Sequence, residues 1–225
     1  MAWWEEGMAQ PLPEDQRPKD NQDTFRFYLK TDQTKRIVFL DDNCFRYYEH
    51  NLKIGGMFFN YFTCTREGCP ICAAGDRPYF AGAFTVADVD GYKDSEGRVQ
   101  GKGRKLLLVC KFHTLEMLKH QWTKRGGLVG AVYEVYRSSK RTAPSVGDSW
   151  DYEGRLDLSK LPDSTPFDYR KILAPKNAET MKAAAQSAEN IKRSESGGGG
   201  SWTAPDGTPA PSDASFPGED ELVPF

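Results

Sequence analysis

Three cysteines that lie within nine residues limit the structure of this 225-residue chain more than any other feature. Their spacing is Cys64-x4-Cys69-x2-Cys72, and its Cys-Pro-Ile-Cys end is a tight turn in which two thiolates can hold one ion. His50 ends a predicted strand shortly before this run. Zinc prefers four tetrahedral Cys or His ligands, and such a set leaves no position for a catalytic water. We therefore predict one structural Zn2+ bound by His50, Cys64, Cys69 and Cys72.

The fourth ligand is the least constrained member of this set, because Cys44, Cys110 and His113 are alternatives to His50. Cys110 lies in an apolar run, where an unbonded core cysteine is common. Closely spaced cysteines in a chain of this length favour a metal site in a reducing compartment over the disulfide frame of a small secreted domain. Three reduced cysteines without a metal are the simpler alternative.

A zinc deaminase is the enzyme that such a Cys-x2-Cys turn first suggests. Its His-x-Glu and Pro-Cys-x2-Cys signatures are not met, because Glu49 precedes His50 and Pro70 lies inside the cysteine pair. No phosphate-binding loop of the P-loop type occurs either. We predict a protein without catalytic activity.

Short aromatic and β-branched runs separated by Asp, Asn, Gln and Thr predict strands beyond residue 24. One clear helix interrupts them, with Thr114 as its N-cap and Gly126 at its end. This order predicts a mainly β protein, an OB-fold five-stranded antiparallel barrel with an inserted zinc-binding subdomain and one or two short helices. An SH3-like barrel and a sandwich are the alternatives. The predicted strands are 25–29, 36–40, 45–48, 81–88, 105–112, 128–136 and 150–156.

Composition divides the chain into four parts. Residues 1–23 form a flexible N-terminal arm, and residues 24–175 the barrel domain with its zinc subdomain around 50–75. An Ala-rich helix at 176–193 is expected on the surface, and the Gly-, Ser- and Pro-rich residues 194–225 form a disordered acidic tail. No apolar run is long enough to span a membrane, and the first ten residues lack the pattern of a signal peptide. We therefore expect a soluble, cytoplasmic protein.

The charges are unevenly distributed along the chain. Residues 24–193 contain 28 Lys and Arg against 20 Asp and Glu, a net charge of +8, whereas the two ends are acidic. A basic body with an acidic tail is typical of proteins that bind nucleic acid, because the body binds phosphate and the tail competes for the same surface. The alternative is that acidic residues are simply common in disordered ends.

Basic and aromatic residues alternate in several predicted strands, which is the combination that holds single-stranded nucleic acid. In the first strand, alternation directs Arg26 and Tyr28 to the ligand face and Phe25, Phe27 and Leu29 to the core. The predicted DNA-binding residues are Arg26, Tyr28, Lys30, Arg46, Tyr48, Arg77, Tyr79, Lys102, Arg104, Lys105, Tyr136 and Arg137.

One set of motifs resembles a known family. Arg36-Ile-Val-Phe-Leu-Asp41, His50, Cys64 and Gly68-Cys-Pro-Ile-Cys72, followed by an aromatic strand pair, resemble the zinc-containing single-stranded-DNA-binding proteins of tailed bacteriophages, which include the helix-destabilising protein of T-even phages. The resemblance covers about residues 24–158. It implies an OB-fold with an inserted zinc subdomain and the same four ligands. It also implies cooperative coating of single strands in replication, recombination and repair within the host cytoplasm.

The last eight residues are similar to the tail of bacterial single-stranded-DNA-binding proteins, in which acids precede a terminal Pro-Phe. In that mode a partner's pocket takes the Phe ring and a basic rim takes the acids. This similarity implies that replication and recombination proteins bind the tail. The predicted partner-binding residues are Glu219, Asp220, Glu221, Pro224 and Phe225.

Two other functions fit the same sequence. One is a zinc-stabilised regulator of transcription or translation that reads duplex DNA or structured RNA. The other is an adaptor that binds only proteins. Binding to single strands and to duplexes of equal length separates the three alternatives.

Overall fold

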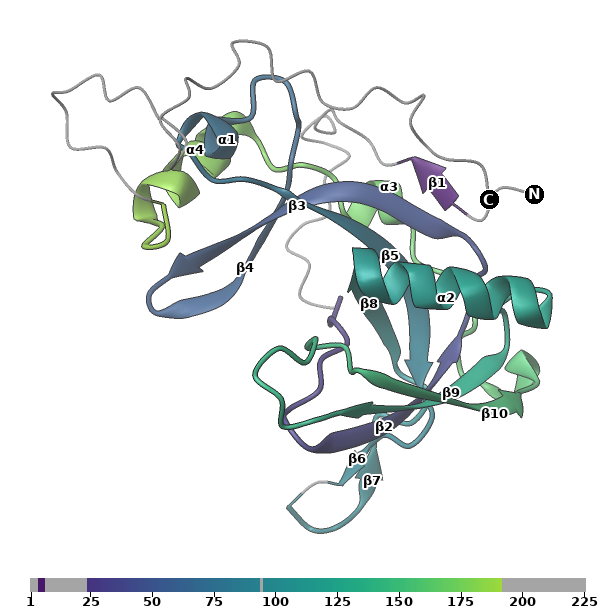
Figure 1. Ribbon diagram of the computed structural model, residues 1–225. Coiled ribbons are helices and arrows are strands. Elements are labelled where there is room, and N and C mark those ends of the chain that lie inside the picture. The colour runs from purple at the N-terminus through teal and green to yellow at the C-terminus, as the bar shows by residue number, and fades with distance from the viewer. Residues whose placement is uncertain (1–3, 7–23, 94, 192–225) are drawn as a thin grey trace, which may run out of the picture. The chain divides into compact units, whose positions relative to one another are not determined.

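The structure is a computed structural model that describes residues 4–6, 24–93 and 95–191. Its secondary structure is mainly β, with few short helices (Figure 1), which confirms the predicted class. The strands are β1 (Trp4–Glu6), β2 (Gln33–Phe39), β3 (Cys44–Ile54), β4 (Met57–Thr63), β5 (Tyr79–Asp88), β6 (Tyr92–Lys93), β7 (Val99–Gln100), β8 (Lys105–Lys111), β9 (Ala131–Arg137) and β10 (Ser149–Arg155). The helices are α1 (Pro70–Ala73), α2 (Phe112–Arg125), α3 (Tyr169–Ile172) and α4 (Ala178–Ser187), and a short 3-10 turn spans Leu158–Lys160.

Eight of the strands form one open sheet in the order β1-β3-β5-β2-β9-β10, with β4 paired to β3 and β8 paired to β5. All pairs are antiparallel except β1 with β3. Segment 24–30 runs along the free edge of β8. Its Phe27 N donates to Leu107 O at 2.9 Å, and its Leu29 N donates to Ser145 O at 2.8 Å. Among the described residues no strand pairing joins β8 to β10, and segment 24–30 makes hydrogen bonds to β8 and to the loop between β9 and β10.

The main core lies between this sheet and α2. Phe39 contacts Phe84 and Tyr133 edge to face, with ring centroids 5.5 and 5.7 Å apart. Helix α2 crosses β5 at Gly82, where a Cβ atom would lie 2.4 Å from Cys44 Sγ. Such a distance is far below van der Waals contact, so the crossing requires glycine. Within the described chain no helix is long and apolar enough to cross a membrane.

Strand β3 is longer than predicted, and its two halves have different partners. The first half pairs with β5, and the second half pairs with β4. Strand β4 was not predicted at all. Gly55 and Gly56 join β3 to β4 with φ values of 58° and 78°, as a two-residue hairpin turn of type I′ requires. Gly-Gly between two apolar runs is the sequence signal that would have revealed this hairpin.

The central helix is confirmed, although its start differs from the prediction. Helix α2 begins at Phe112, before the predicted cap Thr114, and ends at Gly126 with a left-handed φ of 68°. Helix α4 begins after Asn177, whose side chain accepts a hydrogen bond from Thr180 N at 2.7 Å. It ends at Ser187, and the end of the predicted range, 192–193, lies outside the described residues.

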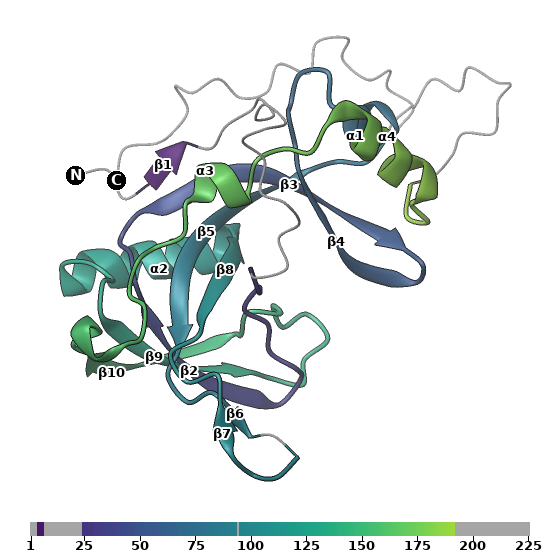
Figure 2. The same cartoon turned by 180° about the vertical axis from the view of Figure 1, so that it is seen from behind.

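The Ala-rich helix α4 lies on the surface with one buried face, which the sequence did not indicate. In α4, Met181 is fully buried and Ala184 and Ala185 are nearly so, in one cluster with Leu52 and Ile71. Small Ala side chains let the helix approach its neighbour closely, so a face with few large residues still forms a core. Figures 1 and 2 show α4 beside α1, with the β6–β7 hairpin at the opposite end of the described structure. The helix therefore packs on the cysteine-bearing segment.

Candidate metal centre and nucleic-acid interface

The structure brings His50, Cys64, Cys69 and Cys72 together, with their ligand atoms all within 4.8 Å of one another. His50 lies on β3, and Cys64 directly follows β4. The hairpin register pairs His50 with Phe62, and Cys64 N donates to Tyr48 O at 2.8 Å, which brings Cys64 back toward β3. Helix α1 supplies the other two cysteines, because Pro70 starts a turn that is capped by Cys69 and contains Cys72.

The distances within this cluster suit a tetrahedral ion. His50 Nε2 lies 3.5 Å from Cys69 Sγ and 3.5 Å from Cys72 Sγ, and Cys64 Sγ lies 3.5 Å from Cys72 Sγ. Four bonds of about 2.3 Å to a central ion would separate the sulfur atoms by about 3.8 Å. The cluster could therefore hold a metal ion with little rearrangement.

Neighbouring groups hold the ligands in place. His50 is fully buried, and its Nδ1 lies 2.7 Å from Asp76 Oδ2, so Nε2 faces the cysteines. Arg66 N donates to Cys64 Sγ at 3.3 Å. These contacts from outside the ligand set fix the ring orientation and satisfy a thiolate, as is usual at protein metal sites.

Without an ion, the four side chains of the cluster share protons unevenly. Burial opposes ionisation of Cys69, but hydrogen bonds from the backbone of Cys72 and Ile71 outweigh it and lower the pKa of that thiol to about 7. Burial and the neighbouring thiols raise the pKa of Cys72. Burial also lowers the pKa of His50, yet hydrogen bonds to Cys64 and Asp76 raise that pKa to about 9. A metal ion at this cluster would displace protons from His50 and Cys72, because it binds neutral imidazole and thiolate.

The alternative fourth ligands lie elsewhere. Cys44 and Cys110 are buried in the main core, and His113 lines a cleft outside the cluster. Within the described residues, His50 is thus the histidine that meets the three cysteines.

A cleft of about 670 Å3, hereafter the central cleft, lies between the β3–β4 hairpin, segment 24–30, the start of α2 and loop 142–146. Tyr28, Phe59 and Tyr79 contribute rings to this cleft from segment 24–30, β4 and β5. Tyr28 and Phe59 are 44% and 64% exposed, and their centroids lie 6.0 Å apart in an edge-to-face contact. The lining combines aromatic and basic side chains: Arg26, Tyr28, Phe59, Tyr61, Tyr79 and Lys111.

Two smaller clefts adjoin the central cleft. One, of about 260 Å3, shares Arg26, Phe59 and Tyr61 with it and reaches Lys176. The other, of about 340 Å3, shares the start of α2 and loop 142–144 and reaches Lys140 and Trp150. The shared side chains place the three clefts next to one another.

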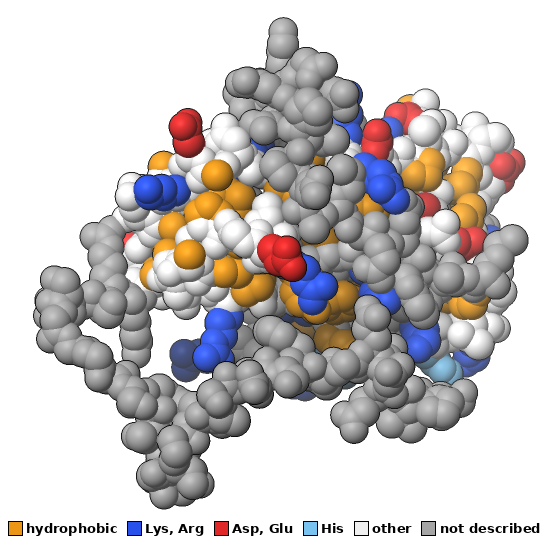
Figure 3. All heavy atoms as spheres, turned by 90° about the horizontal axis from the view of Figure 1, so that it is seen from above, with side chains coloured by type: hydrophobic (Ala, Val, Ile, Leu, Met, Phe, Trp, Pro, Cys, Tyr) orange, Lys and Arg blue, Asp and Glu red, His pale blue; other side chains and the backbone are white. Residues whose placement is uncertain are grey.

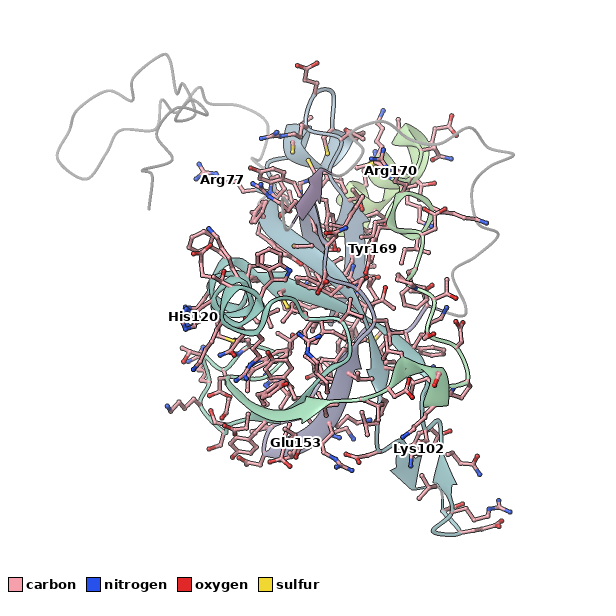
Figure 4. The ribbon with its side chains drawn as sticks, turned by 90° about the vertical axis from the view of Figure 1, so that its right-hand side faces the viewer. Arg77, Lys102, His120, Glu153, Tyr169 and Arg170 are labelled. Atoms are coloured by element: carbon pink, nitrogen blue, oxygen red, sulfur yellow. The ribbon has the colours of Figure 1, made fainter. Side chains whose placement is uncertain are left out.

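The predicted DNA-binding residues do not form one surface. Arg26, Tyr28 and Tyr79 line the central cleft, and Arg137 donates to Tyr28 Oη at 3.2 Å beside it. Figure 4 shows Arg77 and Lys102 at opposite ends of the described structure. Figure 3 shows that basic and hydrophobic side chains also lie next to one another on the face seen from above. Alternation of basic and aromatic residues in the sequence therefore did not distinguish the cleft from other surfaces.

Several of the remaining predicted residues have partners within the protein. Lys105 Nζ forms an ion pair with Asp163 at 2.6 Å. Tyr48 contacts Phe80 edge to face, and the Arg46 guanidinium lies 5.1 Å from the same ring.

Two more of the predicted residues also have partners: Tyr136 Oη donates to Asp32 at 2.9 Å. Arg104 lies 3.4 Å from the Phe25 ring. Phe25 is 49% exposed and does not fill the core as expected, whereas Phe27 and Leu29 are buried as predicted. Lys30 is exposed and lies outside the lining of the central cleft.

Sequence reasoning missed Phe59, Tyr61, Lys111 and His113, which line the central cleft. The first two alternate along β4 and could have been found from the Gly-Gly hairpin signal. Lys111 and His113 flank the junction of β8 and α2, and no local pattern distinguishes them from other surface residues.

The predicted partner-binding tail, Glu219, Asp220, Glu221, Pro224 and Phe225, lies outside the described residues, as does most of the predicted arm. No protein family, curated protein or solved structure matches this chain. The function must therefore be argued from the geometry of the cluster and the clefts.

Proposed function

We propose that this protein binds single-stranded DNA in the central cleft, without catalysis. The observation that supports this most is the meeting of exposed rings and basic side chains from segments far apart in the sequence. Tyr28, Phe59 and Lys111 come from segment 24–30, β4 and β8. Rings that can stack on any base, beside cations that attract phosphate, give affinity for single strands without sequence preference.

The preference for single strands over duplex follows from the rings. Stacking on an aromatic side chain is worth about 1–3 kcal/mol per base, and paired bases within a duplex offer no free face. A basic surface alone would bind both forms, because duplex DNA carries the denser charge.

Strand connectivity supports an OB-type barrel as the framework. Strand β5 pairs with β2 and β8, β2 pairs with β9, and β9 pairs with β10, all antiparallel. Helix α2 joins the third and fourth of these five strands. An OB-fold is a partly open five-stranded barrel that binds oligonucleotides. Here segment 24–30 makes hydrogen bonds to β8 and to the loop before β10, the two strands between which such a barrel would close.

The ion of the proposed metal centre is Zn2+, and its role is structural. Three thiolates and one imidazole are the ligands that zinc prefers, and they fill its tetrahedron. The cluster joins β3, the end of β4 and α1, so a bound ion fixes the base of the hairpin that carries Phe59 and Tyr61.

The wider biological role remains an extension of the family resemblance. We propose that the protein coats single strands during phage DNA replication, recombination and repair, and that its acidic tail recruits other replication proteins. The +8 charge of residues 24–193 supports DNA binding by the body, and the acidic residues after 194 support a separate role for the tail.

Fluorescence anisotropy tests the proposal with oligo-dT and a duplex of equal length, each at two salt concentrations. We expect tighter binding to oligo-dT and a steep loss of affinity with salt. Equal affinity for both ligands would favour a regulator that reads duplexes. Binding to neither would favour an adaptor for proteins.

A further inference from the structure

Glu49 is a buried carboxylate on β3 that lines the smaller cleft reaching Lys176. Its side chain is 1% exposed and accepts hydrogen bonds from Tyr47 Oη at 2.9 Å and Tyr79 Oη at 2.5 Å. Both terminal nitrogens of the Arg26 guanidinium also donate to it, and Nη1 does so at 3.0 Å. Its two oxygens thus have four donors, so the carboxylate is satisfied without water.

Arg26 is held on two sides. Its guanidinium forms a two-point pair with Glu49, and its carbon atom lies 3.7 Å from the centroid of the Tyr61 ring. A planar guanidinium suits both contacts, whereas a lysine would suit neither. Arg26 lines both the central cleft and the smaller cleft that reaches Lys176, so it lies where the two join.

This pairing changes what Arg26 can bind. Glu49 occupies two of the five N–H donors of Arg26, and the pair has no net charge. A phosphate that approached Arg26 would also approach the Glu49 carboxylate, which repels it. Lys111 differs, because it is exposed and has no ion pair within the described part of the chain; its Nζ lies 4.3 Å from the Tyr79 ring.

We propose that Glu49 is a positioning residue that neutralises Arg26 and holds it flat against Tyr61, so that this part of the cleft binds bases and not phosphates. The inference rests on the proposed function. Lys111 then supplies charge for the phosphate backbone, and Tyr79, which contacts both Glu49 and Lys111, separates the two kinds of contact. The strand therefore has one orientation in the cleft, with its bases toward Tyr61.

The salt dependence of binding to oligo-dT tests this assignment. For single strands, the slope of log K against log salt changes by about 0.7 for each phosphate contact. In the full chain, the double variant Arg26→Gln with Glu49→Gln keeps the pair neutral. We expect its affinity to fall by a similar factor at every salt concentration, with an unchanged slope. Lys111→Gln is the matched control, and its slope should become shallower by about 0.7.

Glu49→Gln alone should release the charge of Arg26 and steepen the slope by about 0.7. A double variant whose slope is shallower by that amount would overturn the proposal, because Arg26 would then bind phosphate. An unchanged slope in a folded Glu49→Gln protein would also overturn it, because Glu49 would be merely structural. If Glu49→Gln does not fold, the slope of the double variant decides alone. Failure of the unmodified protein to prefer oligo-dT would instead refute the proposed function.

Discussion

The Nδ1 atom of His50 lies 2.7 Å from Asp76 Oδ2, and this contact directs Nε2 toward three cysteines. Asp76 follows α1, so the segment 69–76 supplies two of the cysteines and also the carboxylate that orients His50. Loss of such an orienting carboxylate typically costs 10- to 100-fold in metal affinity. We expect Asp76→Ala to weaken zinc binding by about that factor. Competition with a chromophoric chelator measures it, and Glu67→Ala, in the loop that precedes α1, should bind as the unmodified protein does.

Zinc should be present at one ion per chain, and its removal should lower the melting temperature, because four ligands from three elements lose their common partner. Metal analysis of His50→Ala and Cys69→Ser should show strongly reduced zinc. Cys110→Ala is the control, since Cys110 lies in the main core. Full zinc occupancy in His50→Ala would show that the ligand set is wrong.

Helix α4 should stabilise the metal centre, because Met181 is fully buried against the cysteine-bearing segment. Met181→Ala should reduce the free energy of unfolding by about 2–5 kcal/mol, the usual cost of such a cavity. It should also speed the loss of zinc to a chelator. Lys182→Ala, at an exposed neighbouring position, should change neither quantity. Equal zinc release from both variants would contradict the packing of α4 on this segment.

Asp41 should make stability depend on pH. Burial raises the pKa of its carboxyl to about 7, although Tyr169 Oη and Thr85 N donate to it. The folded state therefore binds more protons than the unfolded state between about pH 4 and 7. The contribution of Asp41 is complete below this window and is lost as pH rises through it, by at most about 1.4 kcal/mol per pH unit.

Asp41→Asn removes this titration. Denaturant unfolding at pH 5 and pH 7.5 should show a smaller loss of stability in the variant than in the unmodified protein. The same loss in both proteins would mean that Asp41 has an ordinary pKa in the folded state.

The tail prediction concerns residues outside the described part of the chain. Deleting Phe225 should abolish capture of replication proteins from a host extract and leave the affinity for oligo-dT equal or higher, because the acidic tail competes with DNA. Deleting residues 194–225 should raise that affinity. Identical captured proteins with and without Phe225 would contradict recruitment by the tail, and an unchanged affinity after deletion of 194–225 would contradict the competition.

The four residues of the cluster that could hold a metal ion were predicted from the sequence, because three of them lie within nine residues and two form a local Cys-x2-Cys turn. The contacts that define the cleft were not, because they join distant segments. Arg26 was predicted to face a ligand, but its partner Glu49 lies 23 residues away in the sequence. The sequence therefore did not show that Glu49 neutralises the charge of Arg26. Phe25 broke the expected alternation because segment 24–30 makes only a single bridge to β8 at Arg26 and is not a regular strand.

Two other differences have separate causes. The Ala-rich face of α4 resembles a surface pattern, and its burial depends on the neighbouring segment around Ile71, so no local pattern indicates it. Strand β4 has apolar residues on both faces, without the clear alternation that predicts a half-buried strand. For this strand the Gly55-Gly56 turn was the local signal.

The affinity for oligo-dT of two matched ring deletions tests the central claim most directly. Phe59→Ala changes a ring in the central cleft, and Tyr92→Ala changes an equally accessible ring on the β6–β7 hairpin; the two side chains are 64% and 53% exposed. We expect Phe59→Ala to weaken binding by about 5- to 150-fold, the equivalent of one lost stack, and Tyr92→Ala to bind as the unmodified protein does. Unchanged affinity in Phe59→Ala would contradict the account.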